Sequence, residues 1–257
     1  MRAARSIWAK LMRDELGAKK EMSWMLPMHC QTAGVSLTAQ QPLNNLARVA
    51  YQSMAAALGG TQSLHTNSFD EALALPTDDA VKLALRTQQI LAMETGVTDT
   101  PDPFGGSYYL ENLTAEVERR ATDIMKRIKE LGGVVPALEK GYFHREIAET
   151  SYRFELDLAA RRRKIVGVNE HASEGAAPPI LKIDHAVEKG QVRSLKKLKR
   201  DRDDAKTQAA LRRVREAAKG TENLMPPIME AVEAYATVGE VTQALKEVFG
   251  EYPVFGG

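Results

Sequence analysis

Apolar side chains recur every three or four positions along much of this chain, the spacing of amphipathic helices. In the first third, this spacing predicts helices at Arg2 to Glu15, Pro42 to Leu58, Ser68 to Leu75 and Pro76 to Thr95. Pro42 suits a first helical turn, and Gly59-Gly60 ends that helix. Two short stretches between the helices, Trp24 to Met28 and Thr61 to Asn67, are predicted to be strands. Alternating helices and strands indicate an α/β fold with parallel strands.

The pattern changes after the loop Thr100 to Ser107, which is rich in proline and glycine. Beyond it, helices are predicted at Thr114 to Leu131, Ile147 to Arg163, Asn223 to Tyr235 and Glu240 to Phe249. The intervening run "RSLKKLKRDRDDAK" mixes basic and acidic residues, which favours a solvated helical face. The second part of the chain is therefore predicted to be mainly helical.

Composition restricts the partners of the chain. A net charge of +1 over 257 residues argues against general nucleic-acid binding, which usually needs a basic excess. The single cysteine, Cys30, excludes an intrachain disulfide and fits a reducing compartment. No apolar run is long enough for a membrane span, and no secretory signal follows Met1. We expect a cytoplasmic protein without membrane or nucleic-acid partners.

Hydrogen-bonding side chains gather where the two predicted strands end. The first cluster is His29 to Gly34, "HCQTAG", and the second is Gln62 to Asn67, "QSLHTN". Ligands bind at the carboxyl ends of strands in parallel α/β folds, and a glycine permits close backbone approach. The clusters therefore predict a binding surface. The alternative is that these side chains only satisfy backbone groups of the loops.

Two other chemistries can be drawn from the same residues. His29 beside Cys30 suggests a cysteine hydrolase, but adjacent residues of a strand point to opposite faces. A metal site from His29, Cys30 and His65 lacks the ligand spacing of zinc sites. Neither interpretation is favoured, and we predict no metal ligand.

Several long motifs resemble one family. They are "HCQTAGVSLTAQQPLNN", "GGTQSLHTNSFDEALALPT", "ALRTQQILAMETG", "DPFGGSYYLE" and "TVGEVTQALKEVFGEY". Together they resemble the large-subunit sequence of the adenosylcobalamin-dependent acyl-CoA mutases, above all methylmalonyl-CoA mutase. The resemblance covers nearly the whole chain. It implies the C-terminal portion of a (β/α)₈ TIM barrel over residues 1–120, followed by a mainly helical linker over 121–257.

The resemblance also implies a function and a site. Such enzymes isomerise (R)-methylmalonyl-CoA to succinyl-CoA by radical chemistry, with the corrin ring laid across the barrel mouth. Residues implied to bind the cofactor adenosylcobalamin are Gly34, Glu71, Ala72 and Gln31. Residues implied to bind the acyl-CoA substrate are His29, Gln62 and Ser63.

The chain departs from the family pattern at its edges. The early strands, with the family's tyrosine, arginine and histidine that hold the acyl group, are missing, so no catalytic residue is assigned here. The cobalamin-binding domain is also missing, because its signature Asp-x-His-x-x-Gly does not occur. We expect another domain or chain to supply the cobalt ligand. The isolated chain is expected to be inactive and to need an N-terminal barrel portion and a cobalamin-binding domain or subunit, in an oligomer.

Two alternatives remain open within this resemblance. Val35 and Phe104 stand where methylmalonyl-CoA mutases favour tryptophan, which points to an isobutyryl-CoA or 2-hydroxyisobutyryl-CoA mutase large subunit. The chain can also be a non-catalytic partial subunit that works only with a partner.

Overall fold

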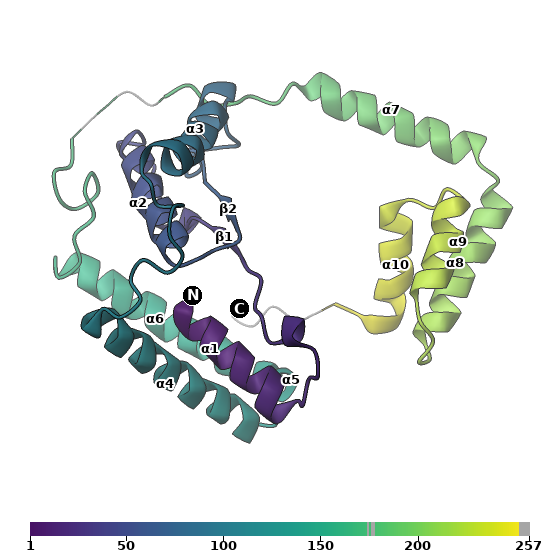
Figure 1. Ribbon diagram of the computed structural model, residues 1–257. Helices are drawn as coiled ribbons and strands as arrows, with labels where there is room; N and C mark the ends of the chain where they lie inside the picture. The colour runs from purple at the N-terminus through teal and green to yellow at the C-terminus, as the bar shows by residue number, and fades with distance from the viewer. Residues whose placement is uncertain (174, 176–177, 252–257) are drawn as a thin grey trace. The chain divides into compact units, whose positions relative to one another are not determined.

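The computed structural model of the chain describes residues 1–173, 175 and 178–251 (Figure 1). The chain divides into two compact units, Met1–Leu181 and Lys182–Gly257. The predicted boundary near residue 120 falls inside a helix of the first unit, and the assignment of a barrel part and a linker remains a prediction. No helix among the described residues is both long and apolar enough to cross a membrane.

The first unit contains two short strands among helices. In chain order, its elements are α1 (Arg2–Lys10), a π-helical turn (Leu11–Glu15), a 3-10 turn (Glu21–Ser23), β1 (His29–Gln31), a second 3-10 turn (Gly34–Ser36), α2 (Asn44–Leu58), β2 (Ser63–His65), α3 (Asp78–Glu94), α4 (Tyr108–Glu130), α5 (Val134–Glu139) and α6 (Tyr142–Ala159). The strands pair in parallel, with Cys30 opposite Leu64. This confirms parallel pairing across a helix, while closure of a barrel remains a prediction.

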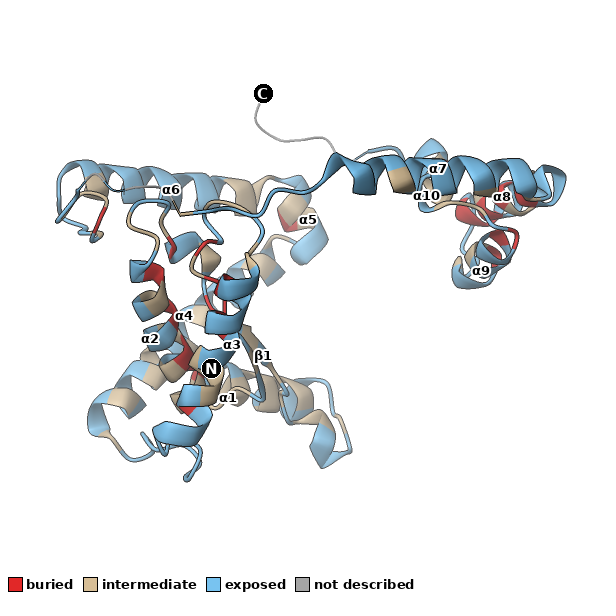
Figure 2. Ribbon diagram, turned by 90° about the horizontal axis from the view of Figure 1, so that it is seen from above, coloured by how far each residue is buried: buried red, intermediate tan, exposed pale blue. Residues whose placement is uncertain are grey.

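The second unit consists of helices among its described residues. They are α7 (His185–Asp201), α8 (Asp204–Ala218), α9 (Met225–Glu233) and α10 (Val238–Phe249). Its core joins α8, α9 and α10 through Leu211, Val214, Ala231 and Ala244. Figure 2 shows buried residues on α8 and α9 and the exposed surface of α7. The mixed charge run is exposed, as predicted, except at Leu198 and Arg202, and it is interrupted at Arg202 and Asp203, where α7 ends and α8 begins.

Two predicted elements are wrong. The predicted strand at Trp24 to Met28 does not form there. Pairing with β2 begins at His29, and Trp24 ends a 3-10 turn. The helix predicted at Ser68 to Leu75 is a series of turns. There the carbonyl of Asp70 accepts hydrogen bonds from the N–H groups of Leu73 and Ala74, at 2.8 and 3.1 Å, and no helix follows until Asp78. Pro76 explains the interruption, since proline disfavours helical conformation in the residue before it.

Packing of α2 against α3 holds the strands in place. The buried apolar side chains are small, including Val49 and Ala56 on α2 and Ala84 on α3. Polar bonds reinforce this contact: Thr66, just after β2, donates from its hydroxyl to the carbonyl of Ala84 at 2.8 Å and accepts from Gln88 Nε2 at 2.9 Å. Strand β2 is therefore fixed to α3 by hydrogen bonds as well as by packing.

Arg2 links the first helix to the loop before α4. Its guanidinium donates to both carboxylate oxygens of Asp102 and to both of Glu111. The hydrogen bonds from Arg2, followed by the one from the N–H of Gly106, lower the pKa of the Glu111 carboxyl. This pairing holds α1 beside α4, an arrangement visible in Figure 1.

A partly buried ion pair joins α10 to the junction between α7 and α8. Arg202, whose side chain is 4% exposed, donates to both carboxylate oxygens of Glu240 at 2.7 Å. Glu240 also completes a capping box with Thr237 at the start of α10. The hydrogen bonds from Arg202 dominate the shift that holds the pKa of Glu240 far below its usual range. A lowered pKa means that the carboxylate stabilises the folded state above the unfolded pKa, and that this stabilisation is lost as pH falls.

We expect Glu240→Gln to lower the free energy of unfolding at pH 7 by about 1–3 kcal/mol, because it keeps a capping-box residue but removes the charge that pairs with Arg202. The difference from wild type should shrink as pH falls below about 4.5, where Glu240 is already protonated in the unfolded chain. Urea unfolding followed by circular dichroism, repeated at several pH values, measures the free energy of unfolding and its dependence on pH. The control Glu233→Gln, at an exposed position of α9, should change little, and a Glu240→Gln effect that is independent of pH would contradict the ion-pair explanation.

Candidate functional site

Polar side chains form one face of the two-stranded sheet. His29 and Gln31 of β1 and Ser63 and His65 of β2 are all exposed, whereas Cys30 and Leu64 are half-buried. Because residues alternate along a strand and the partners are in register, the four polar side chains share one face. His29 and Ser63 are in contact, with His29 Nδ1 2.7 Å from Ser63 Oγ. The polar residues predicted to follow the strands thus partly form them.

A second cluster lies where the strands end. Asn67 is 1% exposed and connects the two loops: its N–H donates to Thr32 Oγ1 and its Nδ2 to the carbonyl of Thr32, both at 2.9 Å. Asn67 Oδ1 in turn accepts from Gln31 Nε2 at 3.0 Å. Buried polar groups that are fully paired in this way restrict the loops to one arrangement.

Gly34 lies at the closest approach of the two loops. A Cβ atom placed on Gly34 would be 2.9 Å from Glu71 Oε1 and 3.2 Å from Asn67 Nδ2. Real Cβ atoms do not come as close as 2.9 Å, so any side chain here would displace Glu71. Glu71 is exposed and flexible enough to move aside, so the tighter limit on a side chain at position 34 is the buried amide of Asn67. Gly34 and Glu71, which were predicted to contact the same cofactor, are brought together.

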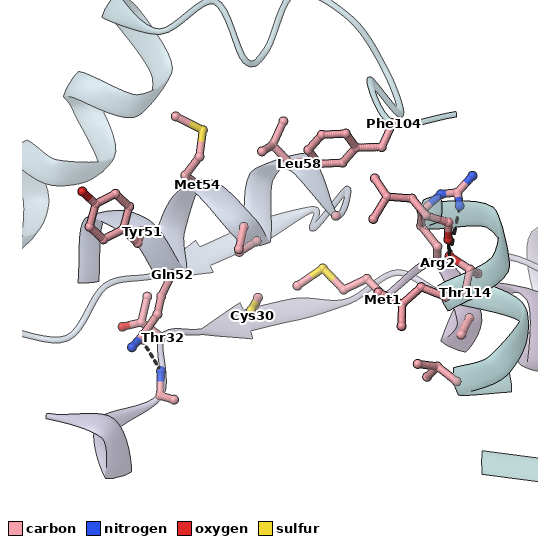
Figure 3. A pocket seen from close by; sticks show the side chains of 18 of the residues that line it. Met1, Arg2, Cys30, Thr32, Tyr51, Gln52, Met54, Leu58, Phe104 and Thr114 are labelled. Atoms are coloured by element: carbon pink, nitrogen blue, oxygen red, sulfur yellow. Dashed lines mark hydrogen bonds between the residues drawn. The ribbon is translucent and has the colours of Figure 1, made fainter. Parts of the chain in front are cut away.

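Gln52 of α2 holds the loop around Gly34 through two hydrogen bonds. Its Oε1 accepts from the N–H of Ala33 at 2.8 Å, and its Nε2 donates to Ser36 Oγ at 2.6 Å. Figure 3 shows the bond to the backbone beside Thr32. Ala33, which precedes the turn, and Ser36, its last residue, are consequently both tied to α2.

An apolar groove of about 750 Å³ opens beside Cys30 (Figure 3). Its lining includes Tyr51, Met54 and Leu58 of α2 and Phe104 from the loop before α4. Figure 3 shows Met1 and Arg2 at the other end of the groove. The lining is predominantly apolar, so the groove suits a hydrophobic segment or ligand better than a charged one.

Gln62 is engaged with the backbone. Its Oε1 accepts from the N–H of Met28 at 2.7 Å and its Nε2 donates to the carbonyl of Gly60 at 3.1 Å. These bonds match the alternative stated above, in which a polar side chain satisfies loop backbone groups. His29, Gln62 and Ser63 lie at the start of the strands, whereas Gln31, Gly34 and Glu71 lie at their ends, with Ala72 exposed in the following turn.

Neither of the other chemistries assembles. Cys30 lies on the opposite face of β1 from His29, and its sulfur is 3.8 Å from the carbonyl of Gln31. Among the residues that the structure describes, no group of three or more histidine, cysteine, aspartate or glutamate side chains could hold a metal ion.

Comparison with known proteins identifies the family. The family model described as methylmalonyl-CoA mutase matches residues 1–251. The chain belongs to this family. Within it, the chain is 46% identical over 255 residues to a methylmalonyl-CoA mutase of Rhizobium meliloti (strain 1021), covering 98% of this chain and 36% of the relative.

Two further relatives show the breadth of the family. The mitochondrial methylmalonyl-CoA mutase of Homo sapiens is 43% identical over 98% of this chain and 34% of its own length. The 2-hydroxyisobutanoyl-CoA mutase large subunit of Aquincola tertiaricarbonis is 41% identical over 99% of this chain and 46% of its own length. This mutase-family chain thus spans about a third to a half of the relatives it matches.

The sequence patterns do not single out His65, Asn67 or Gln52 as residues of the predicted binding site. His65 and Asn67 belong to the predicted polar cluster Gln62 to Asn67. Because side chains alternate along a strand, His65 must share a face with Ser63, and this could have placed it on the polar face. No sequence signal marks Gln52, because its partners Ala33 and Ser36 lie nineteen and sixteen positions earlier in the chain.

We expect Asn67→Ala to lower the free energy of unfolding by about 1–3 kcal/mol, because it leaves the carbonyl of Thr32 and the amide of Gln31 without their partner. Thermal unfolding measures the effect. The matched control Asn44→Ala, which removes an exposed amide that donates to Gln41, should cost less than about 0.5 kcal/mol. Equal effects of the two substitutions would show that Asn67 does not hold the loops together.

Proposed function

We propose that the chain forms part of an adenosylcobalamin-dependent acyl-CoA mutase that isomerises (R)-methylmalonyl-CoA to succinyl-CoA. Family membership supports the reaction class. The observation that carries the site is the close approach of the two loops at Gly34 and Glu71, which brings a residue without a side chain and a hydrogen-bonding side chain together beyond the ends of parallel strands.

The loop residues fit a corrinoid by their chemistry. A corrin ring is flat and carries amide groups at its edge, so it requires a surface without bulk and with neutral donors and acceptors. Gly34 offers the first, and Gln31, Glu71 and the backbone at Ala72 offer hydrogen-bonding groups. When bound, adenosylcobalamin supplies an organic radical through homolysis of its cobalt–carbon bond. We assign the cobalt ligand to another domain or chain.

We place the acyl-CoA substrate on the polar face that begins with His29 and Ser63. The paired imidazole and hydroxyl are exposed and can bind a thioester carbonyl or an amide of the pantetheine arm. Gln62 keeps a substrate role in this proposal, through the exposed part of its amide group. We assign these residues binding and orientation, and no proton transfer.

Open structure around the strands supports a need for further segments. Among the described residues, β1 and β2 pair only with each other, and unpaired strand edges attract other strands. The apolar groove beside Cys30 offers a packing surface for such further segments. We therefore propose an N-terminal barrel portion and a cobalamin-binding domain or subunit as partners in an oligomer. A cytoplasmic location is also part of the proposal, although some relatives are named as mitochondrial.

A second candidate function is isomerisation of 2-hydroxyisobutyryl-CoA or isobutyryl-CoA. It is supported by the relative named 2-hydroxyisobutanoyl-CoA mutase large subunit. Val35 adds to this, because its side chain, 97% exposed beside Gly34, leaves more space than a tryptophan would. A non-catalytic role as a partial subunit is the third candidate, and the same assay separates all three.

The reaction is tested by supplying the missing segments. The chain is combined with the complementary segments of the Rhizobium meliloti relative and adenosylcobalamin, and offered each acyl-CoA in turn. We expect turnover of methylmalonyl-CoA by the reconstituted enzyme and none by the chain alone. Preference for 2-hydroxyisobutyryl-CoA would select the second candidate. Reconstituted enzyme that binds both ligands without turnover would select the third.

We expect Gly34→Val to weaken adenosylcobalamin binding by the reconstituted enzyme at least tenfold, because a branched side chain must displace Glu71 and Asn67 and occupy the ring surface. Titration followed by the visible absorbance of the cofactor measures the dissociation constant. The control Gly190→Val lies on α7, where an added Cβ meets nothing within 4 Å, and should leave the constant unchanged. An unchanged constant for Gly34→Val would remove Gly34 from the cofactor surface.

A further inference from the structure

Asp70 is a buried carboxylate that the proposed function does not use. It is 1% exposed and lies directly before Glu71. Its Oδ2 accepts from the N–H of Thr77 at 3.0 Å and from the Thr77 hydroxyl at 3.3 Å. Its Oδ1 is buried and has no hydrogen-bond partner among the described residues. Burying a carboxylate with one oxygen unpaired costs free energy, so this side chain needs an explanation other than stability.

The bonds of Asp70 connect the start of α3 to the turn that carries Glu71. Thr77 is the N-cap of α3 and accepts from the N–H of Ala80 through its hydroxyl. The Asp70 carbonyl accepts from Leu73 and Ala74, which closes the turn on the other side of Glu71 and Ala72. Side-chain and backbone bonds of one residue therefore fix both ends of this turn.

Phe69, which precedes Asp70, is held by a hydrogen bond from α2. The carbonyl of Phe69 accepts from Asn45 Nδ2 at 2.8 Å, and Asn45 is fully buried on α2. The backbone that precedes Glu71 is thus anchored to α2 at Phe69 and to α3 through Asp70. Glu71 itself is exposed, so its position over Gly34 depends on this backbone and not on packing of its own side chain.

We propose that Asp70 is a positioning residue, whose carboxylate fixes the 70–77 turn so that Glu71 and Ala72 are preorganised beside Gly34 for the corrinoid. This inference rests on the proposed function. Without the bond to Thr77, the turn must be ordered when the ligand binds, and the cost of ordering it reduces affinity. The acyl-CoA face at His29 and Ser63 lies at the other end of the strands and is not expected to respond.

Three variants of the reconstituted enzyme separate positioning from general stability. Asp70→Ala removes both side-chain bonds. Asp70→Asn keeps a carbonyl oxygen that can accept from Thr77. Thr77→Ala removes the N-cap of α3 and the longer hydroxyl bond to Asp70, but keeps the shorter bond from the backbone N–H, and so tests loss of helix stability with that bond intact. For each variant, three quantities are measured: the dissociation constant for adenosylcobalamin, the Michaelis constant for the acyl-CoA and the melting temperature.

We expect Asp70→Ala to raise the dissociation constant for adenosylcobalamin about tenfold, with the Michaelis constant changed less than about twofold. Asp70→Asn should restore affinity to within about twofold of wild type, because it restores the hydrogen bond. Thr77→Ala should lower the melting temperature, with a clearly smaller loss of affinity than Asp70→Ala, because the bond from the Thr77 N–H to Asp70 remains.

Other outcomes overturn the inference. If Asp70→Ala binds adenosylcobalamin as wild type does, the turn needs no positioning by Asp70. If Thr77→Ala weakens binding as much as Asp70→Ala, helix stability explains the effect. If Asp70→Asn is as weak as the alanine variant, the charge matters and not the hydrogen bond. Failure of the wild-type enzyme to bind adenosylcobalamin would instead overturn the proposed function.

Discussion

The parallel pairing of β1 with β2 is the constraint on which the candidate site depends. Pairing His29 with Ser63 and Gln31 with His65 brings loops more than thirty positions apart in the chain to the same end of the sheet. The reciprocal bonds between Thr32 and Asn67 then fix the loops against each other. Each bond contributes only about 1 kcal/mol net, but a change in register would lose all of them together. The geometry at Gly34 follows from this shared register.

Polar groups hold the candidate site, whereas small apolar groups hold the helices. The buried polar residues that follow the strands are Thr32, Thr66, Asn67, Ser68 and Asp70, and Asn45 of α2 contacts the same segment through the carbonyl of Phe69. Between α2 and α3 and within the second unit, alanines, valines and leucines dominate. Hydrogen bonds are directional, so a polar network defines loop positions more narrowly than apolar packing does. This division fits a scaffold of helices that carries preorganised loops.

Periodicity in the sequence was sufficient to predict most helices and the parallel pairing. It failed where local patterns conflicted with tertiary contacts. The pattern at Ser68 to Leu75 predicts a helix, yet the side chain of Asp70 accepts a hydrogen bond from Thr77, and Pro76 prevents continuation into α3. The apolar run at Trp24 to Met28 suggested a strand, but pairing with β2 occurs at the polar residues that follow. Strand register depends on the partner and is not encoded in one segment.

The motifs gave the site residues only through resemblance, and the structure adds their geometry. It brings Gly34 and Glu71 together and pairs His29 with Ser63, two contacts that no spacing in the sequence predicts. It also engages the amide of Gln62 with backbone groups, which composition and pattern could not distinguish from a role in binding. The contacts between the loop side chains therefore define the candidate binding surface, which the order of these residues in the sequence does not reveal.

Hydrogen–deuterium exchange of the reconstituted enzyme, with and without adenosylcobalamin, tests most directly whether the two loops form one surface. Backbone amides of residues 33–36 and of residues 71–74 should both exchange more slowly when the cofactor is present, because both loops contact it. Amides of α8 and α9 provide an internal reference. Slower exchange in one loop without the other, or in neither loop while the cofactor is bound, would contradict the account.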